Sequence, residues 1–216
     1  YQSLNPFEYV LNELSFRKGN PFLQPQYTDN LKLAHTFNYR LTTSISYTYV
    51  SDFFAQVTVA EPNGRNFITT RNVADNEIVN FGISYPKKIN EWRNLYFSLN
   101  AYVSSYKANS PEYLSVKQET LSFYAQNTFT LPKGLRMEVS GWYNSPTVWG
   151  GTYQTRALGS LNLAFQKKYF DDKLTARLAF NDILYTIPWK GTTQFGDLFI
   201  DGSGGSDSRQ VAFGLT

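Results

Sequence analysis

Four aromatic residues in the second half of the sequence are the first candidates for contact with a ligand. Aromatic rings can stack on the apolar face of a sugar ring or of another ligand, and Trp and Tyr also collect where an apolar medium meets water. Which role applies depends on the elements that carry the rings. The four residues are Trp142, Trp149, Tyr153 and Trp189.

Charged residues are the second set of candidates, and none of them belongs to a catalytic pattern. Paired carboxylates such as Asp171 and Asp172 could perform acid–base chemistry, but they fall in a segment with turn composition. The sequence has no P-loop, no dinucleotide-binding fingerprint, no zinc-ligand spacing and no cysteine. We therefore expect no enzyme, no cofactor and no metal site. The charged residues inside regular segments are Lys32, Arg136, Glu138 and Arg177.

The segments that carry these residues alternate apolar and polar side chains. In residues 95–103 every odd-numbered position is apolar, whereas Ser98 and Asn100 are polar. Side chains of a β-strand point to opposite faces with period two, so one face of such a strand is apolar and the other polar. A membrane-spanning barrel needs this pattern, with lipid outside and a polar lumen inside. Nine segments show it: 28–39, 41–49, 79–85, 95–106, 121–131, 135–143, 160–166, 174–181 and 211–215.

The connections between these segments are short and long in regular alternation. Short turns are predicted at Arg40, 86–88, 132–134 and 170–172. Long loops are predicted at 1–27, 51–76, 109–111, 146–151 and 187–207. The Asn63-Gly64 dipeptide indicates a hairpin-like excursion within the second of these loops. Outer membrane barrels show the same asymmetry, with short periplasmic turns and longer extracellular loops.

These patterns predict an all-β fold, a transmembrane antiparallel β-barrel over residues 1–216, with 1–27 as an extracellular loop segment. Nine strands is an odd number, whereas single-chain bacterial barrels have an even number. We therefore expect the C-terminal portion of a larger barrel, for which a 22-stranded transporter with a plugged lumen is the natural parent. A soluble β-sandwich that binds glycans is the less favoured alternative.

The predicted barrel assigns a place to both sets of candidates. An Arg or Lys that faces lipid at the membrane midplane costs about 2–4 kcal/mol, so the four charged residues should face the lumen or a plug. The four aromatic residues lie near the extracellular ends of strands, where an interfacial belt is favoured over contact with substrate.

The overall composition agrees with this prediction. Aromatic residues make up 17% of the chain, as aromatic belts at two interfaces would require. The net charge of +3 comes without clustered basic residues, so we expect no binding of nucleic acid. The mean hydropathy of −0.38 and the absence of a long apolar run argue against transmembrane helices.

Two segments of the sequence resemble a known family. Leu4-Asn5-Pro6, followed by Gly19-Asn20-Pro21-Phe22-Leu23-Gln24-Pro25, resembles the G-N-P-x-L-x-P segment that leads into a barrel strand of TonB-dependent receptors. The variant with an upstream L-N-P resembles the outer-membrane β-barrel family common in Bacteroidetes. Phe180-Asn181-Asp182-Ile183-Leu184, a Gly-rich loop and Ser208-Arg209-Gln210-Val211 resemble its last two strands.

The resemblance implies a multi-pass barrel in the bacterial outer membrane, in contact with outer membrane lipids. It implies an upstream plug domain, energy input through TonB and import of a bulky nutrient. A surface lipoprotein is a further possible partner. The alternative that stays open is a structural or assembly subunit of the cell envelope that does not transport, which would lack the plug and the TonB-binding segment.

Overall fold

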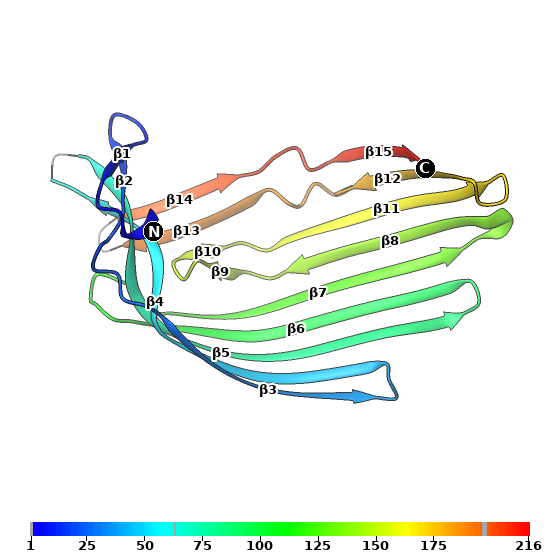
Figure 1. Ribbon diagram of the computed structural model, residues 1–216, viewed down its shortest axis with the longest axis horizontal. Coiled ribbons are helices and arrows are strands. Elements are labelled where there is room, and N and C mark those ends of the chain that lie inside the picture. Colours follow the sequence, from blue (N-terminus) through cyan, green and yellow to red (C-terminus); the bar gives the residue numbers. More distant parts are fainter. Residues whose placement is uncertain (1, 63, 196–197) are drawn as a thin grey trace.

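A long, curved antiparallel sheet forms most of the molecule, and the computed structural model describes residues 2–62, 64–195 and 198–216 (Figure 1). Within the described residues, nine strands follow one another as neighbours in chain order. None of the helices formed by these residues is long and apolar enough to cross a membrane. The nine strands are β3 (Tyr27–Phe37), β4 (Leu41–Ala60), β5 (Asn66–Asn90), β6 (Arg93–Ala108), β7 (Val116–Thr130), β8 (Leu135–Asn144), β11 (Leu158–Tyr169), β12 (Leu174–Asn181) and β15 (Gln210–Leu215).

The two faces of this sheet differ in chemistry and in exposure. The register places Ile83, Leu99, Phe123 and Tyr143 side by side on one face. Phe123 and Tyr143 remain 36% and 37% exposed, whereas Ser140, on the opposite face, is only 9% exposed. The apolar face is therefore the outer one and the polar face is shielded. This arrangement is the reverse of a soluble sandwich, which would bury its apolar face, and it suits a barrel wall in lipid.

Four tight turns lie at one end of the sheet, which we call the turn end, and the opposite end is the loop end. The predicted turns at Arg40, 132–134 and 170–172 are confirmed. The predicted turn at 86–88 is wrong, because β5 continues to Asn90. Pro86 lies beyond the last residue pair of β4 and β5, Thr42–Ser84, so that side of the strand needs no backbone hydrogen bond there. Strands tolerate proline at such edge positions.

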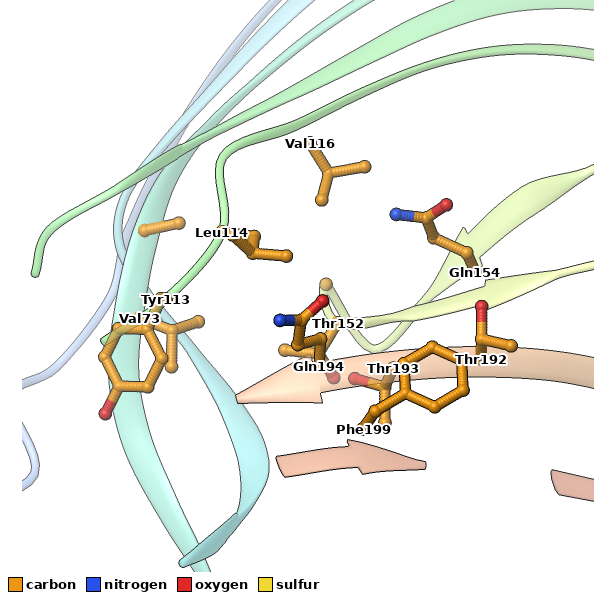
Figure 2. Close-up of a pocket in the computed structure, with 12 residues that line it drawn as sticks. Val73, Tyr113, Leu114, Val116, Thr152, Gln154, Thr192, Thr193, Gln194 and Phe199 are labelled. Carbon is orange, nitrogen blue, oxygen red and sulfur yellow. The ribbon is translucent and has the colours of Figure 1, made fainter. Parts of the chain in front are cut away.

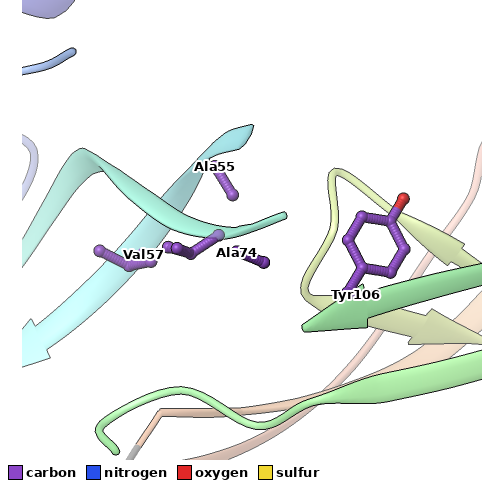
Figure 3. Close-up of a cluster of buried hydrophobic side chains, with 5 residues drawn as sticks. Ala55, Val57, Ala74 and Tyr106 are labelled. Carbon is purple, nitrogen blue, oxygen red and sulfur yellow. The ribbon is translucent and has the colours of Figure 1, made fainter. Parts of the chain in front are cut away.

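The loop predicted at 51–76 is instead a hairpin of two long strands, as its Asn-Gly dipeptide indicates. Strands β4 and β5 contain 20 and 25 residues, whereas a membrane crossing takes roughly 9–11. The pairing shifts register between Val50 and Phe54, next to Asp52 with its positive φ of 52°. Beyond this bulge the hairpin carries its own buried cluster, shown in Figure 3. The cluster consists of Ala55, Val57, Val73, Ala74 and Tyr106.

Two further loop predictions were wrong in detail, because short strands form within those loops. The N-terminal segment contains the 3₁₀ turn η1 (Gln2–Leu4) and strands β1 (Glu8–Val10) and β2 (Ser15–Lys18). Strand β2 pairs in parallel with β5. A second 3₁₀ turn, η2 (Pro132–Gly134), forms the turn between β7 and β8. Strands of three or four residues are too short to show a recognisable alternation in the sequence.

A separate four-stranded sheet occupies the loop end. Its strands are β9 (Thr147–Trp149), β10 (Tyr153–Thr155), β13 (Trp189–Phe195) and β14 (Leu198–Gly204), paired in the order β14-β13-β10-β9. The hydroxyls of Tyr102 and Thr147 lie 3.0 Å apart, and Thr120 Oγ1 donates to the carbonyl oxygen of Pro146 at 3.0 Å. Tyr102 and Thr120 belong to the polar face, so this sheet, which we call the mouth sheet, covers that face.

The main sheet has two open edges. Among the described residues, β3 pairs only with β4, and β15 pairs only with β12. Every residue of β3 is exposed. The sheet is thus an arc of a barrel wall, as the odd number of strands predicted.

Candidate functional site

Three of the four candidate aromatic residues come together in the mouth sheet. The ring centroids of Trp149 and Trp189 are 6.3 Å apart, and those of Tyr153 and Trp189 are 5.6 Å apart in an edge-on arrangement. Trp142 does not join them. It lies in β8, paired with Tyr124 and Ser160, on the polar face of the main sheet.

Glycines of the mouth sheet make room for two of these rings. The Tyr153 hydroxyl lies 2.6 Å from the carbonyl oxygen of Gly191 and 2.9 Å from that of Gly202. A Cβ atom at Gly204 would lie 2.8 Å from the Trp189 ring. Glycine in a strand often marks such a close approach. The Gly-rich composition of 187–207 therefore reflects packing under aromatic rings, and Tyr153 and Trp189 have a structural role.

Trp149 keeps a surface for a ligand. It is 43% exposed and lines a groove of about 620 Å³, the mouth groove, between the β9–β10 hairpin and the β4–β5 hairpin. Phe54, Val57 and Ile68 line the opposite wall. An exposed indole beside aliphatic side chains can stack on a flat, partly apolar ligand.

A smaller cavity of about 240 Å³ adjoins the mouth groove, and Figure 2 shows its lining. Thr152 and Thr193 line both spaces. The sequence gave no sign of this cavity, which we call the threonine–glutamine cavity, because its walls come from β5, the β6–β7 loop, the β9–β10 hairpin and the β13–β14 hairpin. The labelled residues are Val73, Tyr113, Leu114, Val116, Thr152, Gln154, Thr192, Thr193, Gln194 and Phe199.

Three of the four candidate charged residues also gather, at the turn end. Arg136, Glu138 and Arg177 line a small cavity of about 150 Å³. Glu138 Oε2 accepts a hydrogen bond of 2.7 Å from Gln126 Nε2. Gln166 pairs with Arg136 on one side and with Arg177 on the other, which sets both guanidinium groups in one row.

Neither arginine of this row forms an ion pair with a carboxylate in the part of the chain that the structure describes. Lys32 is remote from the row. It lies on the edge strand β3, where it pairs with Ser46. The three charges at the turn end are therefore available to a partner inside the barrel.

The N-terminal sequence motif fastens its segment to the outer part of the sheet. Gly19 N donates to the Asn5 carbonyl oxygen at 2.8 Å, and a Cβ atom at Gly19 would collide with the backbone of Asn5. Asn20 Nδ2 donates to the carbonyl oxygen of Thr70 at 3.1 Å. Asn72 exchanges two hydrogen bonds with the backbone of Gln24, of 2.9 and 3.0 Å. The motif thus has a structural role in this chain.

The second motif contains a fully buried carboxylate, Asp182, directly after β12. Its oxygens accept hydrogen bonds from the backbone N–H groups of Thr186 and Ile187, at 3.1 and 3.4 Å. The Ser208 hydroxyl donates to it at 2.5 Å. The carboxylate therefore connects the end of β12, the entry to β13 and the segment before β15.

Among the described residues, no group of histidine and acidic side chains is arranged to hold a metal ion. Comparison with curated proteins and with solved structures finds no match to this chain. A family model described as the outer membrane protein beta-barrel family matches residues 1–216. The match covers the whole sequence and agrees with the outward apolar face of the sheet, so the chain belongs to the outer membrane protein beta-barrel family.

Proposed function

We propose that this chain forms part of the wall and the outer mouth of a barrel that imports a bulky nutrient with energy from TonB. The chain is a β-barrel protein of the outer membrane. Short periplasmic turns and longer extracellular loops are the rule in such barrels. In this orientation the turn end faces the periplasm and the mouth sheet faces outward.

The observation that carries the proposal is the position of the mouth sheet. It folds over the polar face of the wall, where Tyr102 and Thr120 contact it, instead of extending away from the barrel. Under it lie the mouth groove and the threonine–glutamine cavity. Concave sites with an exposed aromatic ring at the entrance to a lumen suit the capture of a solute.

The unpaired charges at the turn end support a plug inside the same barrel. Arg136 and Arg177 lie on the polar face with no carboxylate partner among the described residues. Guanidinium groups form strong two-pronged contacts with carboxylates. An acidic segment of a plug domain would provide these partners close to the periplasm, where TonB acts in the related receptors.

Uptake by intact cells tests the import proposal. Cells with and without the full-length gene, each with and without TonB, are grown on a complex nutrient mixture, and the medium is analysed for every solute that disappears. We expect at least one solute to be depleted only when both the gene and TonB are present. Equal depletion in all four strains would refute import and would favour the structural-subunit alternative.

A further inference from the structure

The threonine–glutamine cavity presents an amide and a hydroxyl side by side. Gln154 and Thr192 are cross-strand partners in β10 and β13, and both line the cavity. In Figure 2 the two side chains lie at the same side of the cavity. Neither forms a hydrogen bond with another described residue through its side chain. Two neighbouring polar groups without partners can bind a ligand that offers both donors and acceptors.

A buried hydroxyl at the same wall gives a second, independent indication. Thr193 is 8% exposed, and its Oγ1 atom has no hydrogen-bond partner in the described part of the chain. Buried polar groups are nearly always paired, because an unpaired one costs free energy. A rotation about χ1 of Thr193 brings its hydroxyl toward an occupant of the cavity that can pair with it.

The remaining lining excludes a charged ligand. None of the twelve described residues that line the cavity carries a charge. Phe199, 62% exposed, adds an aromatic surface, and Leu114 and Val116 add aliphatic ones. A charged ligand would lose its hydration here without gaining an opposite charge. A neutral ligand with several hydroxyl groups and an apolar face fits both parts of the lining.

We infer that the threonine–glutamine cavity binds one neutral sugar residue, held by Gln154, Thr192 and Thr193. The volume of about 240 Å³ is below the range of roughly 300–1,000 Å³ that is usual for drug-sized ligands, so one ring fits and the rest of a saccharide lies in the adjoining mouth groove. This inference deepens the proposed function by naming a substrate class, but binding can be measured without transport.

Binding of the full-length protein to an array of neutral and acidic saccharides tests the inference. The variants are Gln154→Leu and Thr192→Val, and Thr69→Val is the matched control, because Thr69 lies on β5 outside the cavity. We expect the wild type to bind neutral saccharides, each cavity variant to bind them about threefold to tenfold more weakly, as expected for one lost hydrogen bond, and the control to bind normally. Absence of binding to neutral saccharides, or equal binding by all variants, would overturn the inference.

Thr193→Val supplies a second readout that does not depend on the choice of ligand. Because the variant removes an unpaired buried hydroxyl, we expect a higher melting temperature of the ligand-free protein together with weaker saccharide binding. A lower melting temperature would contradict the role given to Thr193. Depletion of a solute in the uptake experiment without saccharide binding would refute this inference alone, whereas saccharide binding without TonB-dependent depletion would refute import alone.

Discussion

An arginine placed on the outer face of β6 should destabilise the protein far more than one placed on the adjacent residue. Leu99 lies six residues into β6, which begins at Arg93. At about 3.3 Å per residue and a strand tilt of about 40°, Leu99 stands about 15 Å above the turn end. The apolar band of such barrels is about 25 Å tall, so this position is near its middle.

The expected cost of Leu99→Arg is therefore about 2–4 kcal/mol in free energy of unfolding, the value for a cation on the lipid face at midplane. The neighbouring substitution Asn100→Arg should cost less than about 1 kcal/mol, because the side chain points to the polar face. Its cross-strand neighbour there is Gly82, which leaves space for a longer side chain.

Equilibrium unfolding of the full-length barrel from lipid vesicles by guanidinium chloride measures both costs in the same membrane. The difference between the two variants is the informative quantity, because they share a strand, a height and an added charge. If Asn100→Arg proved as costly as Leu99→Arg, the assignment of the two faces to lipid and lumen would be refuted.

Three further predictions follow from the contacts of the motifs and of the turn-end charges. Gly19→Ala should release residues 2–26 from β5, because its Cβ atom would collide with the backbone of Asn5, and limited proteolysis should then cleave this segment faster. Asp182→Ala should lower the free energy of unfolding by about 2–4 kcal/mol, because it leaves several buried donors unpaired, and Asp182→Asn, which keeps an acceptor, should cost less. In the full-length protein, Arg136→Glu combined with Arg177→Glu should loosen the proposed plug domain and increase its amide hydrogen exchange.

Each of these variants has a control in the same chain. Gly214→Ala should leave proteolysis unchanged, since a Cβ atom there would meet no neighbour. Lys32→Glu reverses a polar-face charge remote from the arginine row, so an equal effect on hydrogen exchange would contradict a specific contact with the plug. Equal unfolding free energies of Asp182→Ala and wild type would show that the hydrogen bonds of this carboxylate are not needed.

The nine strands of the wall could be predicted because their side chains report on their surroundings at every second residue. Leu99 and Asn100 reveal two faces in one strand, and the structure places them as expected. Pro86 misled the prediction because a strand tolerates proline once its neighbour on one side has ended. Strands β9, β10 and β14 were missed because glycines and aromatic rings, instead of alternation, hold them together.

The candidate site was only partly accessible to sequence reasoning. Trp149 was selected for its residue type, and the structure gives it an exposed position at a groove. Gln154 and Thr192 are common residues 38 positions apart, and only the pairing of β10 with β13 brings them together. The sequence shows which residues are unusual, whereas this cavity consists of ordinary residues in an unusual arrangement.

The open edges of the main sheet determine how this protein can enter a membrane. Roughly half of the backbone groups of an edge strand point away from its only neighbour, and each unpaired group in hydrocarbon costs several kcal/mol. The 11-residue edge of β3 therefore cannot reside in lipid until another strand pairs with it. Insertion and edge pairing must occur together, so a variant that weakens an edge strand should reduce the amount of assembled protein more than the stability of the molecules that do assemble.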